Sequence, residues 1–283
     1  RSVFEQLGGL RVGFEGSQDH DLALRVGEVA RHVGHLPYIL YHWRCFQGST
    51  AFSGHEKPYS FQAGLNAVQA ALERRGSSGQ AFQPDWAQRG GNGIYQIRFP
   101  DIGPSVTVII PTHNRPDLLQ RCLKSLRKTT YRDYRVLVVD NENHQPVARR
   151  YLDQLDHEVA PIPNRSGQGF SFSYLMNEAV RRTSTDYVLF LNDDTEVLTP
   201  EWLSSLVGHA QLPGVGAAGA LLRYQDGKVQ HAGVVQGIDG LCDHAFKLTR
   251  RGDNGYLSYI AMTRNCIAVT AACLLTRRTL FLE

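Results

Sequence analysis

The sequence predicts an α/β fold for residues 94–283, with a mostly parallel sheet flanked by helices. Three short runs there, at 106–110, 136–139 and 187–191, are apolar apart from Thr107. Strands of a parallel sheet are buried on both faces, so they read as continuous apolar runs of this kind. Helical patterns lie between the runs, and an alternation of strands and helices favours a parallel sheet covered on both faces.

The helices of this region have recognisable boundaries. One is expected from residue 116 to about residue 128, because Pro116 suits the first turn of a helix and apolar residues recur on one side. Another is expected over residues 172–182, before the third apolar run. Together with the strands, these helices complete a repeated strand–helix–strand pattern.

Polar side chains follow each apolar run, where the predicted strand ends. The carboxyl ends of parallel strands meet at one edge of a sheet, and ligands of such folds bind in the crevice outside that edge. We therefore expect these polar clusters to converge on one site. The clusters are Pro111-Thr112, Asp140-Asn141 and Asn192-Asp193-Asp194.

The N-terminal part has a different pattern. Within residues 1–75, a helix is expected around 21–26, a short strand over 35–43, and a second helix over 59–75. Residues 76–93 contain several glycines and are expected to be a linker. The second helix is expected to bury one apolar face, formed by Phe61, Leu65, Val68, Ala71 and Leu72.

Composition excludes several classes of protein. The net charge of +3 is too balanced for a nucleic-acid-binding protein. The five cysteines are scattered and form no C-x-x-C pair, which favours reduced thiols in a cytosolic protein. The longest apolar run, 267–275, is too short to span a bilayer. The chain starts at Arg1 and stops at Glu283, and we expect it to be a piece of a longer protein.

The cluster Asn192-Asp193-Asp194 is a candidate cation site. Adjacent carboxylates repel one another, so their clustering suggests a bound cation or a shared proton. Mg²⁺ and similar hard cations take oxygen ligands, which substrate phosphates commonly complete. The alternative is a solvated turn, because Asn and Asp are common turn residues. The buried strand before the cluster favours the functional interpretation.

Two further sites lie in the N-terminal part. Asp19 and Asp21 both fall at the start of a helix, where acidic residues act as caps or stabilise the first turn. Capping does not account for both, so one of them is a candidate general base. His42 stands between aromatic residues, a setting typical of a core histidine, and Arg44 beside it is a candidate phosphate ligand.

A glycine run from 214 to 219 fits the pattern G-x-G-x-x-G, with Asp239 at the spacing of a dinucleotide site. Such a site needs a strand before the glycines and a helix after them. Here a helix is expected before the run and a strand after it. We therefore expect a connection from helix to strand rather than a nicotinamide site.

These motifs, in this order, resemble family 2 glycosyltransferases. Residues 106–115 look like the opening strand and loop of that family, and residues 136–141 resemble its second strand, which ends in the Asp that faces the nucleotide base. Residues 189–197 resemble its DxD segment, with Asn192 in place of the first Asp. The segments 231–235 and 244–246 are similar to the branch that adds rhamnose or related sugars to bacterial surface polysaccharides.

The first 75 residues resemble a later part of the same family, so the order of the parts is reversed. By this resemblance Asp19 occupies the position of the catalytic base, and His42 that of a histidine that binds the metal in some members. The segment Arg1–Phe4 also resembles Arg278–Phe281. The resemblance therefore implies a tandem parent protein, cut near the same point in each copy, so that missing parts of the parent are among the expected partners.

The resemblance implies an inverting GT-A glycosyltransferase in which residues 1–75 supply the acceptor-side segment and residues 94–283 the nucleotide-sugar-binding part. The expected substrates are a nucleotide-diphosphate sugar and a hydroxyl of a glycan or lipid-linked acceptor, in the cytoplasm or at the inner membrane surface as a peripheral protein. The alternative from another class is a non-catalytic nucleotide-binding fragment, without a base near Asp194. The resemblance implies that a metal ion, Mn²⁺ or Mg²⁺, is bound by Asp194, His42 and Asn192. The residues that it implies for binding the donor are Pro111, Thr112, Asn114, Arg115, Asp140, Asn141 and Asp193.

Overall fold

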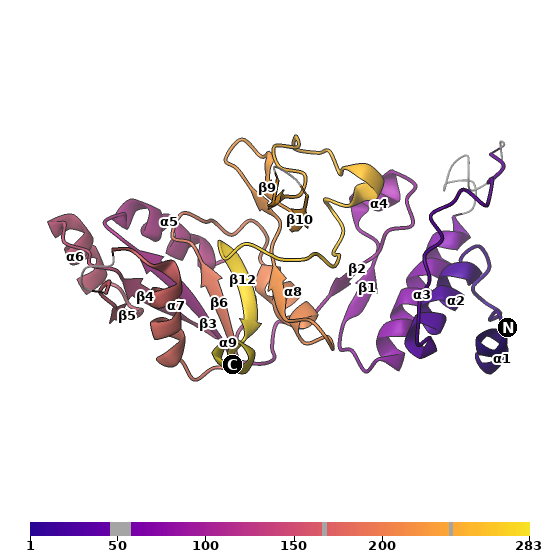
Figure 1. The fold of residues 1–283 in the computed structure, drawn as a ribbon, viewed down its shortest axis with the longest axis horizontal. Coiled ribbons are helices and arrows are strands. Elements are labelled where there is room, and N and C mark those ends of the chain that lie inside the picture. The colour runs from indigo at the N-terminus through magenta and orange to yellow at the C-terminus, as the bar shows by residue number, and fades with distance from the viewer. Residues whose placement is uncertain (46–57, 166–168, 238–239) are drawn as a thin grey trace. The chain divides into compact units, whose positions relative to one another are not determined.

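A computed structural model describes residues 1–45, 58–165, 169–237 and 240–283. The chain forms two compact units, Arg1–Phe99 (unit 1) and Pro100–Glu283 (unit 2). Figure 1 shows the elements of both units in chain order. None of the helices in the described residues is long and apolar enough to cross a membrane. All five cysteines are free, as expected.

Unit 2 is built on a mixed, mostly parallel sheet of six strands in the order β5-β4-β3-β6-β12-β7. The predicted α/β sheet is therefore confirmed. β12 runs antiparallel to both of its neighbours, β6 and β7, and the other neighbouring strands are parallel. The strands are β3 (Val106–Thr112), β4 (Tyr134–Asp140), β5 (Glu158–Pro161), β6 (Tyr187–Leu191), β7 (Ala217–Gly219) and β12 (Cys273–Arg277).

Helices cover both faces of this sheet (Figure 1). On one face, α5 (Pro116–Leu126), α6 (Pro146–Asp153) and α8 (Trp202–Ala210) pack into one apolar cluster with the strands. On the other face, α7 (Phe172–Arg181) and α9 (Arg278–Leu282) contribute to a second cluster. The central strands are buried from both sides, which explains their apolar runs.

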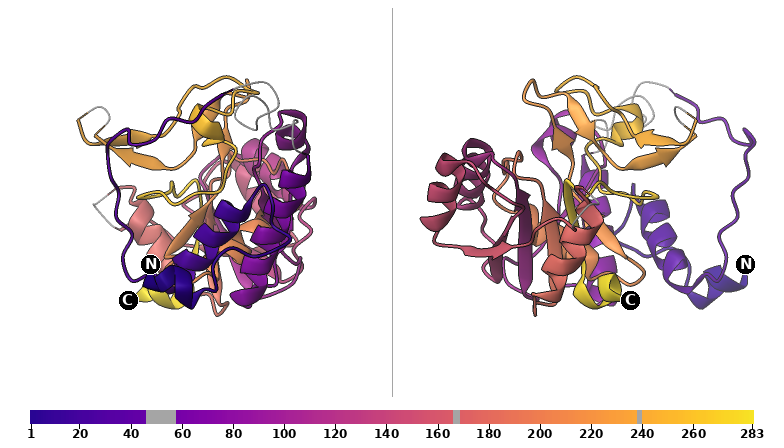
Figure 2. Two further views of the ribbon diagram at one scale, coloured as in Figure 1. Left: turned by 90° about the vertical axis from the view of Figure 1, so that its right-hand side faces the viewer. Right: turned by 60° about the vertical axis from the view of Figure 1, so that its left-hand side comes forward.

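The residues between β7 and β12 form a lobe of short hairpins, which we call the hairpin lobe (residues 220–272). It contains the antiparallel pairs β8·β9 and β10·β11 and a short 3-10 helix, Tyr256–Ser258. Because Gly219 and Leu191 both lie beside the first residues of β12, the lobe leaves and rejoins the sheet at its carboxyl edge. Figure 2 shows it in orange and yellow at that edge. Its strands are β8 (Leu222–Arg223), β9 (Val229–His231), β10 (Val234–Gln236) and β11 (Cys242–His244).

Unit 1 contains both helices expected from its sequence, α2 (Gln18–Val29) and α3 (Tyr59–Arg74), which pack together. The buried face of α3 matches the expected one only in part, since Ala71 and Leu72 are buried as expected. Phe61, Leu65 and Val68 are only half-buried, whereas the fully buried positions are mostly small: Ser60, Ala63, Gly64, Ala67, Ala71 and Leu72. Small residues allow close approach: a Cβ added at Gly64 would lie 2.1 Å from the Tyr95 hydroxyl oxygen.

Residues 76–93, expected to be a linker, are folded. They contain β1 (Gln80–Phe82) and α4 (Asp85–Arg89), and β1 pairs with β2 (Gln96–Arg98). The backbone N–H of Ala81 also donates to the Gln69 side chain on α3, at 2.9 Å. Glycines that suggested flexibility instead form turns, since Gly76 and Gly91 have φ of +64° and +63°. The two units divide between Phe99 and Pro100.

The short strand expected over 35–43 does not form. Residues 31–45 have no helix or strand, and their apolar side chains are exposed, with Ile39 at 87% and Trp43 at 65%. Unit 1 begins with a further short helix, α1 (Ser2–Gln6), that the sequence did not predict.

Candidate active site

The ends of β3 and β4 bring two of the predicted polar clusters together. Thr112 and Asp140 are paired in the parallel register of the two strands. The backbone N–H of Asn141 donates to the Thr112 carbonyl at 3.1 Å, and the Asn143 side chain donates to the same carbonyl at 3.0 Å. Thr112, Asp140 and Asn141 therefore lie side by side at the carboxyl edge of the sheet, as the sequence predicted for parallel strands.

The Asp140 carboxylate is fixed by its own loop and by α6. Its Oδ1 accepts from the backbone and side-chain nitrogens of Asn143, at 2.9 and 2.7 Å, and its Oδ2 accepts from Arg149 at 2.8 Å. Sequence reasoning missed both partners. A signal did exist for Asn143, because Asp commonly bonds to the backbone a few residues on in a turn.

Asn114, expected to contact the nucleotide, connects two loops. Its φ of +54° places it in the left-handed region, which Asn tolerates better than most residues. Its side-chain oxygen accepts from the backbone N–H groups of His144 and Gln145, at 3.0 and 3.1 Å, just before α6. Its own N–H donates to Asn143 at 2.5 Å. These contacts hold the loop after β3 against the loop after β4.

The third cluster follows β6. Burial raises the pKa of Asp193 above its ordinary value. The negative charge of Asp194 raises it further, whereas Thr112 and the positive charge of Arg115 act in the opposite direction without cancelling the effect of burial. Asp194 is exposed and Asn192 is half-buried. The Asn192 N–H donates to the Ala272 carbonyl at 3.1 Å, which ties the cluster to the end of the hairpin lobe.

The side chains of Asn192, Asp193 and Asp194 offer mainly oxygen atoms, the ligand type that Mn²⁺ and Mg²⁺ prefer. The described residues contain no group of three or more His, Cys, Asp or Glu side chains arranged to hold a metal ion. Mg²⁺ is usually held by one or two carboxylates together with substrate phosphates. Asp193, Asp194 and the Asn192 amide fit that kind of partial site, in which a diphosphate completes the coordination.

A cavity of about 740 Å³ opens beside Asn192 and Asp194. Its size falls in the usual range for small-molecule sites. Aromatic and planar polar side chains contribute to its wall, a combination that suits sugar rings, whose faces are apolar and whose rims carry hydroxyls. These wall residues include Trp202, Tyr224, Gln225, Gln230 and Arg251.

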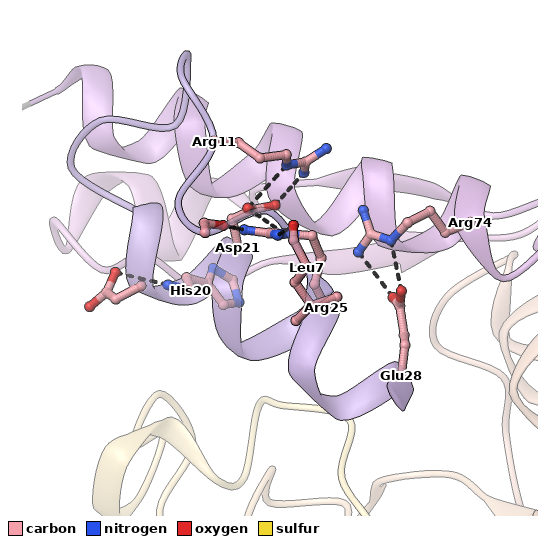
Figure 3. A network of polar contacts seen from close by, with 9 residues as sticks. Leu7, Arg11, His20, Asp21, Arg25, Glu28 and Arg74 are labelled. Atoms are coloured by element: carbon pink, nitrogen blue, oxygen red, sulfur yellow. Dashed lines mark hydrogen bonds and ion pairs between the residues drawn. The ribbon is translucent and has the colours of Figure 1, made fainter. Parts of the chain in front are cut away.

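In unit 1, the two candidate bases have different environments. Asp21 is fully buried and accepts hydrogen bonds from Arg11 and from Arg25, the latter at 2.9 Å (Figure 3). Arg25 also donates to the carbonyls of Leu7 and Gly9, so it ties the N-terminal loop to α2. Burial raises the pKa of Asp21, but the two guanidinium groups outweigh it and leave the pKa below its ordinary value. Asp21 is thus part of the core.

Asp19, by contrast, is exposed on the first turn of α2. Its Oδ1 accepts from the His20 backbone N–H at 2.8 Å, and within the described residues its other oxygen has no hydrogen bond. Asp19 is therefore the one of these two carboxylates that can take a proton from a substrate. His42 is also exposed, in the segment without regular structure.

These two residues belong to unit 1, whereas Asn192, Asp193 and Asp194 belong to unit 2. The site predicted from the sequence thus divides into a part that unit 2 assembles by itself and a part that unit 1 carries. A common site for Asp19, His42 and Asp194 stays a prediction.

The glycine run is a connection from helix to strand, as expected. α8 ends at Ala210, and β7 begins at Ala217 within the run itself. The context of a dinucleotide site is therefore absent from these residues. Asp239, the acidic residue at the matching spacing, lies outside the described residues.

Two bacterial proteins are similar in sequence to nearly the whole chain. The chain is 37% identical over 285 residues to the O-antigen biosynthesis protein RfbC of Myxococcus xanthus, covering 99% of the chain and 22% of RfbC. It is 36% identical to the uncharacterized protein y4gI of Sinorhizobium fredii, covering 99% of the chain and 31% of that protein. The chain thus spans less than a third of the length of these two relatives.

Among solved structures, the mannosyltransferase PcManGT from Pyrobaculum calidifontis, in complex with GDP-Man and Mn²⁺, aligns with 60% of the chain and 46% of its own length, at 19% identity and a TM-score of 0.35. The sequence pattern of the family described as "Glycosyl transferase family 2" matches residues 107–281, which include the acidic cluster and every strand of the main sheet except the first residue of β3. The chain belongs to glycosyl transferase family 2.

Proposed function

We propose that this glycosyltransferase moves a sugar from a nucleotide-diphosphate sugar to a hydroxyl of a glycan or lipid-linked acceptor, with inversion at the anomeric carbon. The observation that carries the proposal is the acidic cluster Asn192–Asp194 at the carboxyl edge, between the Asp140 loop on one side and the cavity on the other. In this order, the Asp140 loop would bind the nucleoside, the acidic cluster the diphosphate, and the cavity the sugar.

The nucleoside half of the donor is assigned to the loops after β3 and β4, around Pro111, Thr112, Asp140 and Asn141. Asn141 is only 4% exposed, and its side-chain oxygen has no hydrogen-bond partner in the described parts of unit 2. A buried acceptor of this kind costs free energy unless a ligand or water donates to it. A donor group of the nucleoside would satisfy it.

The chemical step needs a base and a stabilised leaving group. The acceptor hydroxyl oxygen attacks the anomeric carbon while the bond from that carbon to the diphosphate breaks, and Asp19 takes the hydroxyl proton. Neutralising the charge on the diphosphate is the chemistry that Mn²⁺ or Mg²⁺ supplies when bound at Asp194 and Asn192, with His42 as a further proposed ligand. Arg115 adds positive charge beside Asp193.

We propose that unit 1 derives from one copy of a tandem parent protein and unit 2 from the next copy. α1 and α9 are both five-residue helices, and the segments Arg1–Phe4 and Arg278–Phe281 correspond at their first and last residues. Arg1 precedes α1 as its N-cap, whereas Arg278 is the first residue of α9. Phe281 packs against Phe190 of the sheet, with ring centroids 5.1 Å apart, whereas Phe4 is 45% exposed. The exposed Phe4 is explained if its sheet belongs to a preceding copy that this chain lacks.

We further propose that unit 1 completes the site of unit 2, by placing Asp19 and His42 near Asp194. The support is that unit 2 carries the acidic cluster, whereas unit 1 carries Asp19, an exposed carboxylate bonded through one oxygen to the His20 N–H. No separate linker stands between the two units, which divide between Phe99 and Pro100.

The setting proposed is the assembly of bacterial surface polysaccharides, with rhamnose or a related sugar as the transferred group. The similarity to RfbC, an O-antigen biosynthesis protein, supports the setting. The segments 231–235 and 244–246 support the sugar class by their resemblance to that branch of the family.

Donor hydrolysis, in which water replaces the acceptor hydroxyl, tests the proposed function. The purified chain is incubated with Mn²⁺ and UDP-GlcNAc, GDP-mannose or dTDP-rhamnose, and the released sugar is followed by NMR. We expect release from at least one donor, lost on chelation of the metal, with the first-formed anomer opposite to that of the donor. Tight nucleotide binding without turnover of any donor would instead indicate the non-catalytic alternative.

A further inference from the structure

Two histidines of the hairpin lobe are in direct contact. His231 ends β9 and His244 ends β11, and their Nδ1 atoms are 2.6 Å apart. The rings meet edge to face, with an interplanar angle of 82°. His231 is 1% exposed, whereas His244 is half-buried. Two ring nitrogens at this distance share one hydrogen, so one histidine donates and the other accepts.

The other ring nitrogen of His231 decides which one donates. Its Nε2 faces the backbone N–H groups of Gly233 and Thr270, at 3.3 and 3.4 Å. Backbone N–H groups only donate, so this nitrogen accepts. The neutral ring of His231 therefore carries its hydrogen on Nδ1 and donates it to Nδ1 of His244, and the hydrogen of a neutral His244 is left on Nε2.

The surroundings hold His231 in this state. Burial, then His244 and Arg264, lower the pKa of His231 to about 4, so it is neutral at ordinary assay pH. Gly233 has a φ of +86°, and a Cβ there would lie 2.9 Å from the Cys266 Cβ. Glycine is required at this position for both reasons, which accounts for the sequence His231-Ala-Gly.

The pair is tied to the acidic cluster through a short segment. Thr270 donates to His231, and two residues later the Ala272 carbonyl accepts from the Asn192 N–H. The whole lobe stands at the carboxyl edge, where ligands of such sheets bind. In the described residues no hydrogen bond is made by His244 Nε2. Asp243 and Lys247, the charged neighbours of His244, bond to each other.

We propose that His244 contacts the nucleotide-sugar donor, with its Nε2–H donating to a donor oxygen, and that His231 is the positioning residue that fixes this tautomer. The inference rests on the proposed function. The accepting oxygen belongs either to the diphosphate or to a hydroxyl of the transferred sugar, both of which accept such a hydrogen bond.

Calorimetry on four variants tests the contact, with UDP, GDP and dTDP and their sugar conjugates as probes in the presence of Mn²⁺. His244→Ala should weaken binding about 10-fold or more, the range of a hydrogen bond to a charged or polar ligand group. His231→Gln, whose amide can both accept and donate in the same positions, should stay close to wild type, whereas His231→Leu should resemble His244→Ala. His157→Ala, an exposed histidine before β5 at the opposite edge, is the control.

The probes distinguish the two oxygens. If His244→Ala weakens the binding of nucleoside diphosphates and of nucleotide sugars equally, the contact is to the diphosphate. If it weakens the binding of the nucleotide sugars alone, the contact is to a sugar hydroxyl. If His244→Ala binds all probes as His157→Ala does, the inference is wrong while the proposed function stands. If wild type binds no nucleotide, both fail.

Nitrogen NMR of isotope-labelled histidine adds a test that needs no ligand. We expect the hydrogen on Nδ1 of His231 and on Nε2 of His244 in the wild type, with the His244 signals changed by His231→Leu and retained in His231→Gln. A hydrogen on Nδ1 of His244 would overturn the positioning role directly.

Discussion

Replacement of Asp194 with alanine is expected to abolish metal-dependent nucleotide binding and to lower sugar transfer by about 1000-fold or more, the scale of losing a main electrostatic contact to the leaving group. Asp194 is exposed at the end of β6 and lines the cavity. In the proposed site it supplies the carboxylate that holds the cation against the diphosphate. Calorimetric titration with a nucleoside diphosphate, with and without Mn²⁺, measures the effect.

The matched control is Asp153→Ala. Asp153 is an exposed carboxylate at the end of α6, and α6 follows β4 back toward the amino edge of the sheet. It should bind nucleotide as the wild type does. An unchanged affinity in Asp194→Ala, with Mn²⁺ still required, would place the cation elsewhere.

The second large effect is expected at Asp19. Asp19→Asn keeps the shape of the side chain but removes its basicity, so kcat should fall about 1000-fold, within the usual range for a general base, with little change in nucleotide affinity. Because Asp19 is exposed and, in the described residues, is bonded only to its neighbour's N–H, the melting temperature should stay near that of the wild type. Steady-state kinetics and thermal unfolding together check both statements.

Asp21→Asn provides the contrast. It leaves Arg25, which is 5% exposed, without its carboxylate partner, and breaking a buried ion pair typically costs about 3–5 kcal/mol. We therefore expect a clear loss of thermal stability in unit 1. If Asp19→Asn retains full kcat, Asp19 is not the base, whatever the behaviour of Asp21→Asn.

The sheet and its functional edge could be predicted because they depend on short-range patterns. Apolar runs at 106–110 and 187–191 identify buried strands, and the polar residues that follow them must meet at one edge once the strands are parallel. The meeting of Thr112, Asp140 and Asn141 follows from that rule alone. The residue types and their order thus predict most of the edge that we propose binds the nucleotide.

The contacts that fix the site could not be predicted in the same way. The role of Asn114 depends on its left-handed backbone and on the position of α6, and the His231–His244 contact depends on how two hairpins pack. No periodic pattern in the sequence predicts the backbone conformation of Asn114 or the packing of the two hairpins. A family resemblance pointed to both histidines but gave them no role.

Unit 1 shows the limits of composition as a guide. Glycines at 76 and 91 suggested a flexible linker but form turns that end α3 and α4. The expected face of α3 includes three large residues that are only half-buried, whereas Gly64 lies on the buried face because Tyr95 packs closely there. In both cases the tertiary contact, rather than the local preference, decided the structure.

The central proposal is that unit 1 completes the active site of unit 2, and Mn²⁺ at the proposed Asp194 site would test it directly. Bound Mn²⁺ broadens the NMR signals of nearby nuclei, and Mg²⁺ provides the diamagnetic reference. In an isotope-labelled chain saturated with a nucleoside diphosphate, we predict broadening at the Asp19 amide and the His42 ring as well as at Asn192, with all of it lost in Asp194→Ala. Broadening confined to unit 2, with the Asp19 and His42 signals unchanged, would contradict the claim.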